Sequence, residues 1–138
     1  MDLKNIFSKN IEIDYKGYVN HEEAIRLIKS SHLLINFMYK NTEETDMMSG
    51  KLIEYIASGS PIINFSNSGK ESEYILKFSK KSFNANSSSE KKVVRFITDE
   101  YNDWISGKYE KSSLDNIDYL SRESLTKKLL DIIIKINS

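Results

Sequence analysis

The spacing of apolar residues predicts alternating strands and helices in the first third of the chain. Apolar and polar residues alternate over 11–15 (IEIDY), which is typical of a short strand. Asn20 precedes two glutamates and an apolar stripe, which predicts a helix that begins there and ends near Ser30–Ser31. The unbroken apolar run over 32–37 (HLLINF) suits a strand covered on both faces, as in parallel sheets.

The same alternation continues after an aperiodic loop over 38–48. Residues 49–58 place their apolar side chains on one helical face. Gly59 fits the position just after that helix, and Pro61 opens the next buried strand, which extends to Phe65. A further helix over 70–77 and a short strand over 82–85 complete the central part.

The last third of the chain is predicted to be mostly helical. Serines 87–89 offer caps for a helix that extends through Trp104. The polar stretch over 106–119 is expected to be a loop with at most one helical turn, and residues 122–137 to form a final helix. We expect Tyr101, Trp104 and the isoleucine-rich final helix to contribute to the core rather than to a site.

Strands that alternate with helices predict an α/β fold with a Rossmann-like parallel sheet of about four strands. The pattern indicates one domain over 1–138, in which 11–105 form the α/β part and 120–137 a C-terminal helix. A doubly wound domain usually has five or six strands, so the sheet is expected to be incomplete.

Composition narrows the functional classes. The chain has 138 residues, 20 basic and 20 acidic side chains and no cysteine. Balanced charge argues against nucleic-acid binding, and the lack of cysteine excludes disulfides and thiolate metal sites. No apolar run is long enough for a membrane span, and the first ten residues lack the apolar core of a signal peptide. We therefore expect a cytoplasmic protein, in which His21 and His32 belong to no metal-ligand set.

The segment 46–63 (DMMSGKLIEYIASGSPII) carries the most informative chemistry. Here a loop leaves a strand and enters a helix at Ser49, Gly50 and Lys51, at the sheet edge where open α/β proteins bind ligands. The start of a helix favours an anion such as phosphate, and Glu54, one turn later, can accept two hydroxyl hydrogen bonds. The plain alternatives are a simple helix cap at Ser49, a surface lysine and a solvated carboxylate.

The segment 50–63 (GKLIEYIASGSPII) resembles the K-L-x-E-Y-x-A-x-G-x-P-[IV]-[IV] signature of the glycosyl transferases group 1 family. Weaker similarities lie at 15–19 (YKGYV), 22–30, 31–35 and 121–123, so that the resemblance covers residues 11–135. The family consists of nucleotide-sugar-dependent enzymes of the GT-B fold. The resemblance implies that this chain is their C-terminal, donor-binding domain, shortened at its N-terminal side.

Two acidic positions follow from the resemblance. Glu54 stands at the second acid of the family's E-x7-E motif, which holds the ribose of the nucleotide. The first acid, near the donor sugar, would be Asp46, an aspartate in place of the usual glutamate. Glu43 or Glu44 could take this role instead if the loop is remodelled, and a loop or capping acid is the plain alternative for Asp46.

The resemblance also implies how the rest of the donor is held. The diphosphate would lie beside the helix start, where the helix dipole and a basic side chain neutralise it without a metal ion or a resident cofactor. The base would lie against the loop that follows a Gly-Tyr pair. By position, these binding residues are Ser49, Gly50, Lys51, Gly17 and Tyr18.

As a function, the resemblance implies transfer of a sugar from a nucleoside diphosphate sugar to a polysaccharide or glycolipid acceptor, in bacterial surface-glycan synthesis. The acceptor-binding N-terminal domain has no counterpart in the sequence, so we expect no catalysis by this chain alone. Peripheral membrane association is an expectation for the full enzyme, and self-association through an open strand edge for this chain. The alternative is a non-catalytic α/β interaction or regulatory module derived from such a domain.

Overall fold

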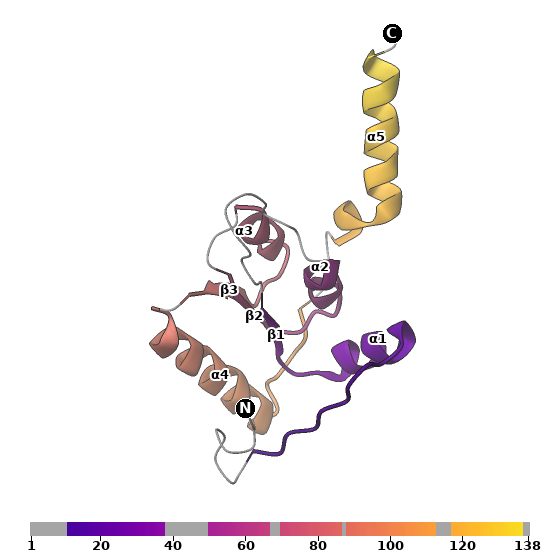
Figure 1. Cartoon of the computed structure of the whole chain (residues 1–138). Coiled ribbons are helices and arrows are strands. Elements are labelled where there is room, and N and C mark those ends of the chain that lie inside the picture. Colours follow the sequence, from indigo (N-terminus) through magenta and orange to yellow (C-terminus); the bar gives the residue numbers. More distant parts are fainter. Residues whose placement is uncertain (1–10, 38–49, 67–69, 87, 113–116, 137–138) are drawn as a thin grey trace.

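Three parallel strands form the centre of the protein, in a computed structural model that describes residues 11–37, 50–66, 70–86, 88–112 and 117–136. The strands are β1 (Leu34–Phe37), β2 (Ile62–Phe65) and β3 (Ser82–Ala85), and their order in the sheet is β1-β2-β3. Both pairings are parallel. The fold is therefore the expected α/β class, with an open Rossmann-like sheet (Figure 1).

Helices cover the two faces of the sheet unequally. Figure 1 shows α2 (Gly50–Ala57) and α3 (Lys70–Leu76) on one side and α4 (Glu90–Ile105) on the other. Because α2 and α3 each connect neighbouring parallel strands in the same direction, right-handed crossovers place both on one face. The main core lies under these two helices and consists of Leu34, Leu52, Ile56, Ile62, Ile75, Leu76 and Leu120.

The first helix confirms the capping pattern of the sequence. Helix α1 (His21–Ser30) begins after Asn20, whose side-chain oxygen accepts a hydrogen bond of 2.9 Å from the backbone N–H of Glu23. This bond satisfies one of the unpaired N–H groups at the helix start. At the start of α4, in contrast, the Ser89 hydroxyl makes no capping bond and donates to the side chain of Asn86 instead.

The predicted strand over 11–15 does not form, and the described sheet has three strands where about four were expected. The side chains of Ile11 and Tyr15 are exposed. An alternating pattern shows that a segment suits a sheet, but a strand exists only where a neighbour supplies backbone hydrogen bonds. Within the described residues, no strand pairs with this segment.

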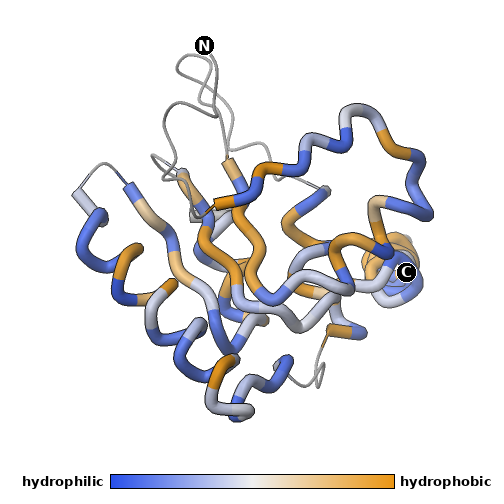
Figure 2. The backbone as a smooth tube through the Cα atoms, turned by 90° about the horizontal axis from the view of Figure 1, so that it is seen from below, coloured by the Kyte–Doolittle hydropathy of each residue, from blue (hydrophilic) through white to orange (hydrophobic). Residues whose placement is uncertain are grey.

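Strand β1 is an edge of the described sheet and is covered on one face only, in contrast to the two-sided burial expected for 32–37. Leu34 is buried, whereas Ile35 and Phe37 on the opposite face are 42% and 73% exposed. The Phe37 ring stacks on Phe65 with centroids 5.0 Å apart. Figure 2 shows hydrophobic segments concentrated in the central strands, while α4 alternates between hydrophilic and hydrophobic residues.

The open edge predicts self-association at high concentration. A neutral edge strand with exposed apolar side chains offers unpaired backbone groups to a second chain. We expect Phe37→Lys, which places a charge on that edge, to keep the protein monomeric in sedimentation velocity experiments in which the wild type gains mass. Ile105→Lys, at an exposed apolar site on α4, is the control and should behave like the wild type. A strictly monomeric wild type would contradict the prediction.

The end of the chain forms the expected helix but contributes little to the core. A short 3-10 turn, η2 (Ile117–Leu120), leads into α5 (Arg122–Ile136), which projects away from the sheet in Figure 1. The leucine and isoleucine side chains of α5 are exposed, and so are Tyr101 and Trp104 on α4. The expectation that these residues are core is therefore wrong. Periodicity identifies an apolar helix face, but it does not show whether another element covers that face.

Candidate functional site

A cavity lies at the carboxyl edge of the sheet, between the end of β1 and the first turns of α2. Its volume is about 640 Å³. In open α/β sheets this edge is where ligands bind, because loops and helix starts converge there. The cavity is lined by Ile35, Asn36, Phe37, Gly50, Lys51, Glu54 and Tyr55, and we refer to it as the α2 cavity.

The sequence of α2 explains how its polar side chains reach the cavity. Leu52 and Ile56 are buried in the core and fix the rotation of the helix. Lys51 and Glu54 are three residues apart and therefore neighbours on the helix surface. The first turn carries no acidic residue, so the positive end of the helix dipole is not neutralised by a side chain of that turn. The cavity thus combines a cation and a helix start with a carboxylate one turn further along.

The pKa of Tyr55 depends on burial and on charge at the α2 cavity. Its pKa is raised above the ordinary value, first by burial and then by the negative charge of Glu54. Both effects disfavour the phenolate. Since the fold favours the protonated phenol, this contribution to stability is lost as the pH rises above about 10, the usual tyrosine pKa.

We expect Glu54→Gln to lower the pKa of Tyr55, because it removes the neighbouring charge and leaves only burial. The pKa is measured from the pH dependence of the Tyr55 ring signals in NMR spectra. Glu73→Gln on α3 removes a carboxylate that does not line the α2 cavity, and it should leave the titration unchanged. An unaltered Tyr55 pKa in Glu54→Gln would show that the two groups do not interact.

The structure brings together three of the residues predicted for the donor site. Gly50, Lys51 and Glu54 line one cavity. Two others, Ser49 and Asp46, lie outside the described residues, as do the alternatives Glu43 and Glu44. These four positions keep the status of sequence predictions.

Gly17 and Tyr18 do not join this group. They belong to the segment that precedes α1, in which Gly17 has a positive φ of 63°. The side chain of Tyr18 is 99% exposed, and neither residue lines the α2 cavity. The role of this pair in ligand binding stays a prediction from the sequence.

Two polar residues of the α2 cavity, Asn36 and Tyr55, were not singled out in the sequence. Asn36 was counted as part of an apolar run, and Tyr55 as part of a signature. A signal for Asn36 was present, because asparagine occupies the next-to-last position of all three strands, at 36, 64 and 84. The register of the strands places these three asparagines side by side.

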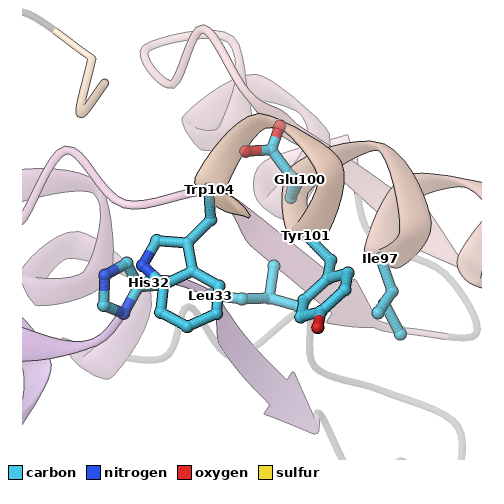
Figure 3. A pocket seen from close by; sticks show the side chains of 6 residues that line it. All are labelled: His32, Leu33, Ile97, Glu100, Tyr101 and Trp104. Atoms are coloured by element: carbon cyan, nitrogen blue, oxygen red, sulfur yellow. The ribbon is translucent and has the colours of Figure 1, made fainter. Parts of the chain in front are cut away.

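A second, smaller cavity of about 220 Å³ lies before the amino end of β1 (Figure 3). The His32 ring contacts the Trp104 ring edge-on at 5.5 Å and the Tyr109 ring at 5.0 Å, which agrees with a structural role for this histidine. The hydroxyl of Tyr109 also donates to the His32 carbonyl oxygen. The cavity is lined by His32, Leu33, Ile97, Glu100, Tyr101 and Trp104, and apolar surface predominates in it.

Over the part of the chain that the structure describes, no three histidine, cysteine, aspartate or glutamate side chains gather to hold a metal ion. None of the described helices combines the length and apolar character needed to cross a bilayer.

The fold and the α2 cavity define a parallel α/β protein with a ligand-sized opening at the carboxyl edge of its sheet. In comparisons with known proteins, the chain matches no family model, no curated protein and no solved structure.

Proposed function

We propose that this chain is the donor-nucleotide part of a retaining, GT-B type glycosyltransferase that uses a nucleoside diphosphate sugar. The observation that carries the proposal is the meeting of Gly50, Lys51 and Glu54 in one cavity at the carboxyl edge of a parallel sheet. These three residues belong to the segment 50–63, whose sequence resembles the donor-binding signature of the glycosyl transferases group 1 family.

The side chains of the α2 cavity suit two parts of such a donor, its diphosphate and its ribose. Lys51 and the start of α2 offer positive charge to the diphosphate, whose oxygens accept but do not donate hydrogen bonds. Glu54 offers carboxylate oxygens to the ribose hydroxyl groups, which donate. In this proposal the chain holds the donor through its own residues, without a metal ion.

Transfer itself requires a partner. Enzymes of this fold react in the cleft between two domains, because the acceptor must be held in line with the donor sugar. We propose that an acceptor-binding domain completes the active site, that the acceptor is a polysaccharide or a glycolipid, and that the reaction takes place in the cytoplasm. On its own the chain binds the donor and does not transfer the sugar.

Calorimetric titration with uridine diphosphate and guanosine diphosphate tests the donor site. We expect one of them to bind with a dissociation constant in the millimolar range or below. Glu54→Ala removes a charged hydrogen-bond acceptor worth roughly 1.5–3 kcal/mol, so the affinity should fall by about ten- to a hundredfold.

Glu73→Ala provides a matched control, since it removes a carboxylate on α3 that does not line the α2 cavity. This variant should bind like the wild type. If neither diphosphate binds the wild-type protein, the donor-site proposal is wrong.

A second candidate function is a non-catalytic interaction module. It is favoured by the exposed apolar side chains of β1 and α5, which form surfaces that another protein could cover. The same titration separates the two candidates, because a module of this kind does not need to bind a nucleoside diphosphate.

A further inference from the structure

Three asparagine side chains cross the sheet in a continuous hydrogen-bonded ladder. The Asn36 amide nitrogen donates to the side-chain oxygen of Asn64 at 2.6 Å, and the Asn64 nitrogen donates to the side-chain oxygen of Asn84 at 2.6 Å. The residues are direct partners in the strand register. Asn64, in the middle, is 0% exposed.

The burial of Asn64 couples the orientations of its two neighbours. A buried amide must use both its acceptor and its donor side, because leaving either unpaired is costly. Asn64 accepts from one neighbour and donates to the other, so each amide in the ladder points the same way. Reversing one of them would place two donors or two acceptors against each other.

The two ends of the ladder open into different cavities. Asn36 lines the α2 cavity with Lys51 and Glu54. Asn84 lines a separate cavity beside α3, to which Lys77 also contributes. The ladder uses one of the two N–H groups of Asn36, so its oxygen, on the side of the amide away from Asn64, and its second N–H lie outside the ladder.

We propose that this asparagine ladder sets the hydrogen-bonding polarity of the α2 cavity: it holds the Asn36 oxygen at the open edge of the sheet, as an acceptor for a ligand that bears hydroxyl groups. Asn36 and Glu54 then both accept, which matches the donating hydroxyls of a ribosyl unit. Phosphate oxygens cannot donate and are left to Lys51 and the start of α2. The identity of the ligand rests on the proposed function, whereas the polarity of the cavity does not.

The polarity is tested first on the unliganded protein by NMR. A scalar coupling across the hydrogen bond from the Asn36 side-chain nitrogen to the Asn64 side-chain carbonyl carbon is expected. The reverse coupling, from the Asn64 nitrogen to the Asn36 carbonyl carbon, would overturn the proposal, as would the absence of both. This measurement needs no ligand and decides the polarity whatever the protein binds.

The effect on binding is tested from the far end of the ladder. Asn84→Leu keeps a similar volume but leaves the Asn64 nitrogen without an acceptor, so the orientation of Asn36 is no longer fixed. Affinity for uridine diphosphate, measured by calorimetry, should fall about five- to tenfold. Affinity for pyrophosphate, which has no hydroxyl-bearing group, should not change.

Asn84→Asp is the matched control, because its carboxylate still accepts from Asn64 and should retain wild-type affinity for uridine diphosphate. Equal losses in Asn84→Leu and Asn84→Asp, or no loss in either, would overturn the role of the ladder in recognition. If the wild type binds no nucleoside diphosphate, the proposed function and the ribosyl assignment fail together, and the NMR coupling still decides the polarity. If Asn84→Leu does not fold, Asn36→Leu provides the same comparison between uridine diphosphate and pyrophosphate.

Discussion

Replacing Gly59 with alanine is expected to destabilise the protein by roughly 2–4 kcal/mol. Gly59 follows the end of α2 with a φ of +72°, a left-handed conformation that L-residues rarely adopt. A Cβ atom added there would lie 2.6 Å from the backbone oxygen of Ser112. That contact is on backbone and cannot be relieved by a side-chain rotation. The Ser112 N–H also donates to the Gly59 carbonyl oxygen at 2.8 Å, so moving either chain weakens a second interaction.

Gly107→Ala separates the two causes of this loss. Gly107 also has a positive φ, of +70°, but no atom lies within 4 Å of the position that its Cβ would take. Its substitution should cost only the conformational penalty, about 1–2 kcal/mol. Urea denaturation of both variants measures the difference in the free energy of unfolding. Equal losses at the two positions would mean that the chain around Ser112 adjusts freely.

Leu52→Ala is expected to cause a loss of about 2–5 kcal/mol, since it removes a core side chain that is 1% exposed. Leu52 lies on α2 and belongs to the cluster that joins this helix to β1, β2 and α3. Truncating it leaves a cavity that the surrounding strands fill only in part. Because the same helix carries Lys51 and Glu54, affinity for a nucleoside diphosphate should fall together with stability.

Leu129→Ala is the matched control. The same atoms are deleted from α5, where Leu129 is 58% exposed. The free energy of unfolding should change by less than about 0.5–1 kcal/mol. A large loss would show that α5 is covered in solution, for example by a second copy of the chain.

Much of the fold follows from the sequence because local signals and burial agree in the central part of the chain. The helix over 49–58 could be located since its apolar face, Gly59 and Pro61 all point to the same boundaries, and the structure confirms α2 from Gly50. The prediction of a strand over 11–15 was wrong because a strand forms only where a neighbouring strand pairs with it. The final helix was placed correctly as an element but wrongly as core, because nothing in its own sequence shows what would cover it.

The candidate site also contains residues that the sequence predicted and residues that it missed. Gly50, Lys51 and Glu54 were predicted because they occupy fixed positions in one helix, and a helix brings residues three and four apart together. Asn36 was missed since its role depends on Asn64 and Asn84, which reach it only through the pairing of strands that are distant in sequence. Gly17 and Tyr18 do not line the α2 cavity, and their position relative to it depends on a long-range contact that local patterns cannot specify.

The position of β1 has a thermodynamic consequence. Ile35, Asn36 and Phe37 line the α2 cavity and also form the open edge of the described sheet. A chain that pairs with this edge therefore contacts the same strand as the ligand. If pairing alters the geometry of β1, ligand binding and chain association become linked equilibria. Each then changes the affinity of the other by the same factor, so that a subunit or domain seated on β1 would act as a regulator of the site without entering it.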